Sequence, residues 1–352
     1  MKSCFAMFLA LGVFSSAFAF DADKQRFQFS YQSLTYTGEI LYSRSEAKAT
    51  VVLIPGHGTT DLVEGDQFKA LREFLLDQSY NVAYWDKAGC GLSEGEYDHF
   101  QSIPSSAAEA IEALKVLEAA EPDPGKLGFW SISRGGWIVP KIFESYDDLA
   151  FWISVSGTSE LDNSRYMLEA NLKAEGRTQQ QIELLMGEWD DYQRILVRGG
   201  SLEEFNAATG NLMLDPYFNS NDFRMTEDGL RNIQSFYRTS DLDFDEASNL
   251  AIMYADLPSA LKAMDVPVLS LLGRLDTQID WQATGLLYAE AAKAGAMQLS
   301  QIYLDNCNHV MQQSQTGGVN EVLPTDVAPC EGYYEGMASW LKRLNSDDPS
   351  AH

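Results

Sequence analysis

Short apolar runs alternate with helical patterns over the first 156 residues of the chain. Phe27 to Tyr31 and Ser33 to Tyr42 alternate polar and apolar positions, as two antiparallel strands do. The continuous apolar runs that follow are typical of strands buried on both faces, and they lie at Thr50 to Ile54, Asn81 to Trp85, Lys126 to Trp130 and Leu149 to Val155. Helical spacing separates these runs at about Asp66 to Gln78, Ser105 to Ala119 and Arg134 to Glu144. This order predicts an α/β fold, with a mostly parallel central sheet flanked by helices.

The alternation stops near Gly157 and resumes at Val266. The residues between are helical in pattern and rich in acids, aromatic residues and methionines. The later pattern predicts strands at Val266 to Leu272 and Gln298 to Leu304, and helices at Trp281 to Ala292 and Tyr333 to Leu344. We therefore predict an α/β core of residues 20–156 and 265–352, with a helical cap of residues 157–264 inserted into it.

The first nineteen residues have the pattern of a secretory signal peptide. Lys2 precedes an apolar run from Phe5 to Val13, and Ala17-Phe18-Ala19 gives the small-x-small pattern of a cleavage site. The apolar run is short for a membrane span, although a retained anchor is the alternative. We expect cleavage after Ala19, export to the periplasm or the medium, and no stable membrane association afterwards.

The chain is strongly acidic, with a formal net charge of −26. Such a surface repels nucleic-acid phosphates and anionic lipid headgroups, so we expect neither as a partner. A small-molecule substrate remains, and the sequence does not set the oligomeric state.

Cysteine spacing gives no zinc site, and no P-loop or dinucleotide-binding motif is present, so we expect no metal or cofactor. Cleavage would leave Cys90, Cys307 and Cys330. In an oxidising compartment Cys307 and Cys330 are candidates for a disulfide, although sequence cannot show whether they approach each other.

The strongest local motif is Ser131-Ile132-Ser133-Arg134-Gly135, which lies between a predicted strand and a predicted helix. A serine at such a turn presents its hydroxyl above the sheet when small residues stand two positions before and after it. Ser131 stands where glycine is usual, and the serine is still small. We identify Ser133 as the candidate nucleophile.

A serine hydroxyl needs a base, usually histidine, and the chain has four: His57, His99, His309 and His352. His352 is the last residue, and His57 and His99 precede the serine. In the chain order serine, acid, histidine, only His309 follows both partners without use of the C-terminal tail. His309 is therefore the candidate base.

Asp276 is the candidate acid that orients this histidine. It follows the predicted strand Val266 to Leu272, and α/β sheets gather their sites at the carboxyl ends of strands. Asp280 and Asp305 are the alternatives. Asp280 is better placed as the N-cap of the helix at Trp281, and Asp305 is close enough to His309 for local loop hydrogen bonding.

Acyl transfer also requires donors for the oxyanion that develops on the substrate. We expect one to be the backbone N–H of Arg134 and the other to be that of His57. Glycines on both sides of His57 allow its loop to approach a substrate closely.

Together these segments resemble the α/β-hydrolase superfamily over nearly all of the mature chain. Val52-Leu53-Ile54-Pro55-Gly56-His57-Gly58 looks like its oxyanion loop, with Pro55 where histidine is common. Asp86-Lys87-Ala88-Gly89-Cys90-Gly91-Leu92-Ser93 looks like its structural D-x-R-G-x-G-x-S segment, with Ala88 in place of arginine. The resemblance implies a Ser133–Asp276–His309 triad and a serine esterase or a related aminopeptidase.

Three functions follow from this pattern. The first is an exported serine hydrolase that cleaves carboxylic esters through an acyl-enzyme, with aromatic residues of the cap either lining the acyl site or forming the cap's own core. The second is an aminopeptidase, in which Glu188, Asp190 and Asp191 of the cap would bind a substrate amine. The third is a non-catalytic binding protein of the same fold.

Overall fold

The computed structural model of the 352-residue chain describes residues 23–219, 223–239 and 242–345. The predicted signal peptide, residues 1–19, lies outside these ranges, as does His352. Within the described ranges, no helix combines the length and apolar character that crossing a bilayer requires.

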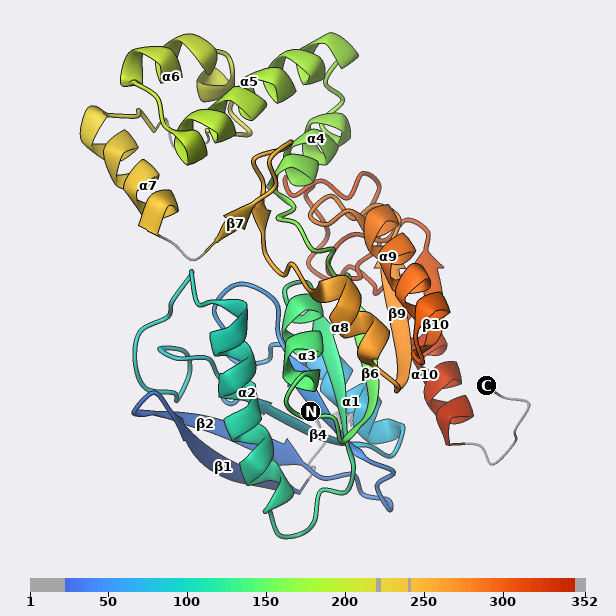
Figure 1. Cartoon of the computed structure of the whole chain (residues 1–352). Coiled ribbons are helices and arrows are strands. Elements are labelled where there is room, and N and C mark those ends of the chain that lie inside the picture. Colours follow the sequence, from blue (N-terminus) through green and yellow to red (C-terminus); the bar gives the residue numbers. More distant parts are fainter. Residues whose placement is uncertain (1–22, 220–222, 240–241, 346–352) are drawn as a thin grey trace, which may run out of the picture.

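An eight-stranded sheet forms the centre of the molecule (Figure 1). Its strands are β1 (Lys24–Tyr31), β2 (Leu34–Leu41), β3 (Thr50–Ile54), β4 (Asn81–Trp85), β5 (Leu127–Ile132), β6 (Leu149–Val155), β9 (Pro267–Gly273) and β10 (Gln298–Leu304). They lie in the order β1-β2-β4-β3-β5-β6-β9-β10. β2 pairs antiparallel with β1 and β4, and every other pairing is parallel. The predicted sheet is confirmed, including its antiparallel beginning.

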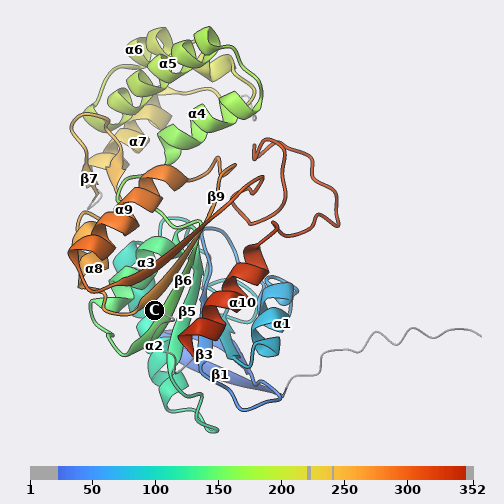
Figure 2. The ribbon, with the colours of Figure 1, turned by 90° about the vertical axis from the view of Figure 1, so that its right-hand side faces the viewer.

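Helices cover both faces of this sheet (Figures 1 and 2). α1 (Lys69–Asp77) and α10 (Tyr333–Leu344) pack on one face, and the other face carries α2 (Ile103–Glu118), α3 (Gly135–Phe143), α8 (Leu257–Ala263) and α9 (Trp281–Ala294). Side chains of β5 alternate between the two resulting cores, with Phe129 in one and Trp130 in the other. Burial on both faces explains why the central strands are continuous apolar runs.

Several elements have the predicted bounds, and the differences have local causes. β5 continues two residues beyond the predicted end, to Ile132, because Ser131 and Ile132 still pair with β6. α1 begins at Lys69, not at about Asp66, because Phe68 has a left-handed φ of 56° and cannot join the helix.

The inserted segment after β6 contains α4 (Ser164–Ala174), α5 (Gln179–Arg198), α6 (Leu202–Ala208), η1 (Leu212–Leu214), α7 (Glu227–Thr239) and the short strands β7 (Asp243–Phe244) and β8 (Ala251–Ile252). Capping boxes start two of these helices, Thr178 with Gln181 and Ser201 with Glu204. The segment stands as a helical lobe beyond the carboxyl end of the sheet (Figure 2). α8 belongs instead to the helix layer on the sheet face. We predicted a cap that extends to residue 264, whereas the chain has already returned to the core at Leu257.

Candidate active site

Ser133 occupies a sharp turn between β5 and α3. Its φ of 55° is left-handed, which is uncommon for a residue with a side chain and marks a backbone held in place by its surroundings. Gly56 of the neighbouring loop lies so close that a Cβ built on it would stand 3.0 Å from the Cβ of Ser133. The glycine therefore allows the loop after β3 to approach the serine.

Ser131 has a structural role at the base of the same turn. Its side chain is fully buried, and its hydroxyl accepts a hydrogen bond of 2.9 Å from Nε1 of Trp152. A Cβ on Gly135 would stand only 2.7 Å from the Cβ of Ser131. The turn thus tolerates serine in place of glycine at position 131 because position 135 has no side chain.

His309 and Asp276 come together as a buried pair. His309 Nδ1 hydrogen-bonds Asp276 Oδ2 at 2.8 Å, and the side chain of Asp276 has no exposed surface. The other carboxylate oxygen, Oδ1, accepts the backbone N–H groups of Gln278 at 2.8 Å and Ile279 at 3.0 Å. These donors fix the carboxylate, which in turn fixes the imidazole ring so that Nε2 is left for another partner.

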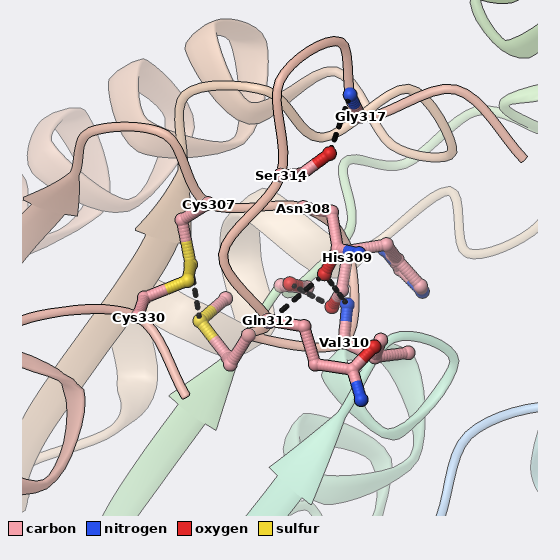
Figure 3. Close-up of a disulfide and its surroundings, with 10 residues drawn as sticks. Cys307, Asn308, His309, Val310, Gln312, Ser314, Gly317 and Cys330 are labelled. Carbon is pink, nitrogen blue, oxygen red and sulfur yellow. Dashed lines mark hydrogen bonds between the residues drawn. A yellow bond between two sulfur atoms is a disulfide. The ribbon is translucent and has the colours of Figure 1, made fainter. Parts of the chain in front are cut away.

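The loop that carries His309 is anchored at several points. Ser156 donates its hydroxyl to the carbonyl oxygen of His309 at 2.7 Å, and Leu275 donates its N–H to the carbonyl of Cys307 at 2.9 Å. Cys307 is joined to Cys330 by a disulfide with a Cα–Cα distance of 5.5 Å (Figure 3). The histidine loop is therefore tied both to the acid loop and to the segment before α10.

Ser133 and His309 line the same cavity. Among the described residues, no hydrogen bond joins the serine hydroxyl to the imidazole. The sheet ends thus bring together the three residues that sequence reasoning selected.

The loop after β3 supplies the second wall of this cavity through residues 55–59. The backbone N–H groups of His57 and Arg134 have no hydrogen-bond partner among the residues that the structure describes. The Arg134 side chain points elsewhere, to the hydroxyl of Ser106 and the carbonyl of Gln101. Two free N–H groups beside a serine turn suit an oxyanion.

The imidazole of His57 is not paired with an acid. Burial, and then the positive charges of Lys87 and Arg134 and the nearby His99, lower the pKa of His57 below its usual value. The ring of His57 lies 5.9 Å from that of His99. A neutral His57 side chain agrees with a role for its backbone alone.

The alternative acids are engaged elsewhere. The carboxylate of Asp280 caps α9 by accepting the N–H groups of Gln282 and Ala283, as its place in the sequence suggested. Asp305 is exposed and pairs with Arg274 at 2.9 Å. Of the three candidate acids, Asp276 alone contacts His309.

The cavity beside Ser133 has a volume of about 710 Å³. Its walls come from residues 66–71 at the start of α1, from Met311 and Gln312, from Val327 and Pro329, and from the two tyrosines that open α10, Tyr333 and Tyr334. Within the described residues, none from 157–264 lines it. The sequence did not predict this side of the cavity, because no pattern of residues relates the start of α1 to a loop roughly 250 residues later.

The cap side chains pack mainly against one another. Two apolar clusters, one that contains Trp189 and one that contains Phe205, form the interior of the cap. The three carboxylates proposed for amine binding are also engaged there: Glu188 accepts from Asn211 and Leu212, Asp190 pairs with Arg165, and Asp191 pairs with Arg194. The cap contacts the loop of Asp276 through α4, from which Tyr166 donates its hydroxyl to the carbonyl of Asp276 at 2.8 Å and Asn171 donates its side-chain amide to the carbonyl of Thr277 at 3.1 Å.

The chain matches no protein-family model and no curated protein sequence. Solved structures resemble it over most of its length. A thermostable carboxyl esterase from Bacillus coagulans is 13% identical, with 91% of this chain and 98% of that one covered and a TM-score of 0.54. An esterase from Pyrococcus furiosus is 12% identical, with 82% and 84% covered and a TM-score of 0.51. DcsB, solved with a substrate analogue, is 14% identical, with 92% and 99% covered and a TM-score of 0.51.

Proposed function

We propose that this chain, which has the α/β-hydrolase fold, is a serine hydrolase that cleaves carboxylic esters through an acyl-enzyme intermediate. The fold predicted from sequence is confirmed by its similarity to known esterases. The observation that carries the proposed activity is the buried Asp276–His309 pair, which faces the cavity of a serine held at a strained strand-to-helix turn.

In the acylation step, His309 takes the proton of the Ser133 hydroxyl as its oxygen bonds to the ester carbonyl carbon. The carbonyl π electrons move to oxygen, and the N–H groups of His57 and Arg134 stabilise the resulting oxyanion. Asp276 stabilises the imidazolium. When the tetrahedral intermediate collapses, His309 gives its proton to the leaving alcohol, and the acyl group remains on Ser133.

Deacylation repeats these steps with water. His309 removes a proton from a water molecule that attacks the acyl carbon, and the same N–H groups hold the second oxyanion. Collapse returns the proton to the oxygen of Ser133 and releases the carboxylic acid.

We place the acyl group in the cavity between α1 and the loop from Cys307 to Cys330. A volume of about 710 Å³ is in the range of sites for small organic ligands. Trp130, Ile132 and Tyr333 give apolar and aromatic surface in the cavity that Ser133 also lines. Gln278 and Gln312 provide polar groups nearby.

Narrowing this cavity should change which acyl chains are accepted. We expect Val327→Trp to lower kcat/KM for long-chain p-nitrophenyl esters by about tenfold, because the indole would take space that a long acyl chain needs, and leaving about two methylenes unburied costs roughly 1.6 kcal/mol. The acetate ester should be hydrolysed within about twofold of wild type, because it needs little of the cavity. The matched control is Leu214→Trp, on an exposed residue of the cap. If the preference for acyl-chain length changed in Leu214→Trp and not in Val327→Trp, the acyl site would instead lie in the cap.

The substrate class is tested with purified protein on matched esters, thioesters and aminoacyl-arylamides. We expect esters to have the highest kcat/KM, since each cap carboxylate proposed to bind a substrate amine already has a partner. Preference for an arylamide with a free amino group would favour the aminopeptidase. Absence of turnover on every substrate, with no covalent labelling of Ser133, would favour a binding protein.

We also propose export. The disulfide between Cys307 and Cys330 supports it, because disulfides persist in oxidising compartments. In a bacterial host, the mature protein should begin at Phe20, and a peptide pair containing Cys307 and Cys330 should be linked without added oxidant. Intact-mass and non-reducing peptide analysis of the periplasmic fraction checks both. A chain that keeps residues 1–19 and stays in the membrane fraction would indicate the retained anchor.

A further inference from the structure

Lys87 contacts the loop that carries one of the two free N–H groups. It follows β4 in the segment from Asp86 to Ser93, and its ammonium donates hydrogen bonds to the carbonyls of Gly56 and of Gly58, the latter at 2.8 Å. The backbone N–H of Lys87 donates to the hydroxyl of Thr60 at 2.9 Å. Lys87 therefore contacts the loop at Gly56, at Gly58 and at Thr60.

The contact with Gly56 sets the direction of the His57 N–H. The carbonyl of Gly56 and the N–H of His57 belong to one planar trans peptide group, in which C=O and N–H point in opposite directions. Because the Gly56 carbonyl is directed at the ammonium, the His57 N–H is directed away from it. The same relation links the Gly58 carbonyl to the N–H of Thr59.

The peptide group between these two is held by another residue. The N–H of Gly58 donates to the hydroxyl of Tyr97 at 2.9 Å, which fixes the plane shared with the carbonyl of His57. Three consecutive peptide groups of this loop therefore each form a hydrogen bond with a side chain outside the loop. Gly58, with a φ of 101°, allows the loop to reverse between them.

The ammonium also polarises the peptide group that it holds. A positive charge at the carbonyl end strengthens the N–H at the other end as a donor, and the effect is larger where water is excluded. That is the end at which the proposed mechanism places the oxyanion.

We propose that Lys87 is a positioning residue for ester hydrolysis, which in its protonated form aims and polarises the His57 N–H toward the oxyanion. This inference rests on the proposed function. Lys87 itself does not contact the substrate in this role.

The surroundings of Lys87 make its charge dependent on pH. Burial, and then the guanidinium of Arg134, lower the pKa of Lys87 to about 8, while Glu109 and Cys90 act in the opposite direction. His57 and the ring of Tyr97, 5.9 Å from the ammonium, also face it. The active form is the protonated one, present below this pKa, so activity should fall as the pH rises through about 8.

The test compares Lys87→Met, Lys87→Arg and wild type, with kcat and KM for a short p-nitrophenyl ester measured from pH 6 to 10. We expect Lys87→Met to lower kcat about 10- to 100-fold, less than the loss of an oxyanion donor itself, with KM within about threefold. Its remaining activity should lack the fall near pH 8. Lys87→Arg should recover part of kcat and also lack that fall, because guanidinium stays charged throughout.

Lys48→Met is the control. The exposed Lys48 also donates to a backbone carbonyl, that of Gln78, but it precedes β3 and so lies at the end of the sheet opposite the site. It should behave as wild type. Thermal unfolding checks each variant, and if Lys87→Met does not fold, the profile of Lys87→Arg decides. Wild-type kcat in Lys87→Met, or an unchanged alkaline fall in either variant, would overturn the inference. Ser133→Ala in the same series tests the proposed function separately, because an active Ser133→Ala would refute the mechanism itself.

Discussion

Ser133→Ala should abolish ester hydrolysis, with kcat reduced about 10⁶-fold, because the other hydroxyl of the turn, that of Ser131, is buried and does not line the cavity. The fold should persist, since the Ser133 side chain makes no hydrogen bond among the described residues and alanine is smaller. The measurement is single-turnover and steady-state hydrolysis of p-nitrophenyl acetate, with circular dichroism and thermal unfolding to check the structure.

Ser131→Ala is the matched control for that variant. The Ser131 hydroxyl accepts from Trp152 in the core, so its removal should leave the indole N–H unpaired and cost about 1–3 kcal/mol of unfolding free energy. We expect kcat to stay within about tenfold of wild type, because Ser131 does not reach the cavity. If Ser131→Ala were inactive and Ser133→Ala active, the assignment of the nucleophile would be reversed.

Asp276→Asn should lower kcat about 10⁴-fold while leaving the protein folded. Asparagine keeps an oxygen for the N–H groups of Gln278 and Ile279, but its amide nitrogen would face His309 Nδ1. The imidazole would then carry its proton on Nε2, where it cannot accept the proton of Ser133. The measurement is the pH dependence of kcat, with the ester at saturating concentration.

Asp280→Asn provides the same chemical change four residues away. Asparagine caps a helix about as well as aspartate, so this variant should keep both activity and stability close to wild type. Comparable losses in Asp276→Asn and Asp280→Asn would contradict a specific role for Asp276.

The sequence was sufficient for the sheet and for the proximity of the triad candidates. Continuous apolar runs such as Thr50–Ile54 are buried on both faces, and parallel strands end on the same edge. Residues that follow β5, β9 and β10 therefore meet there, as the hydrogen bond between Asp276 and His309 shows. The departure at Ser131 is explained only in three dimensions, by the space that Gly135 leaves.

The substrate cavity and the contacts of Lys87 could not be predicted in the same way. They depend on how irregular loops fold against distant elements, such as the disulfide-linked loop against the start of α1. The aromatic residues of the cap could by their sequence either line an acyl site or form the cap's own core, and the structure places most of them in that core. Hydrophobicity marks a residue for burial without specifying its partner.

The nucleophile can be identified by locating a covalent adduct. The purified protein is treated with a fluorophosphonate, digested, and analysed by tandem mass spectrometry that separates Ser131 from Ser133. We predict one stoichiometric adduct on Ser133, formed more slowly in Asp276→Asn and absent in Ser133→Ala. An adduct on another residue, or an active protein that remains unlabelled, would contradict it.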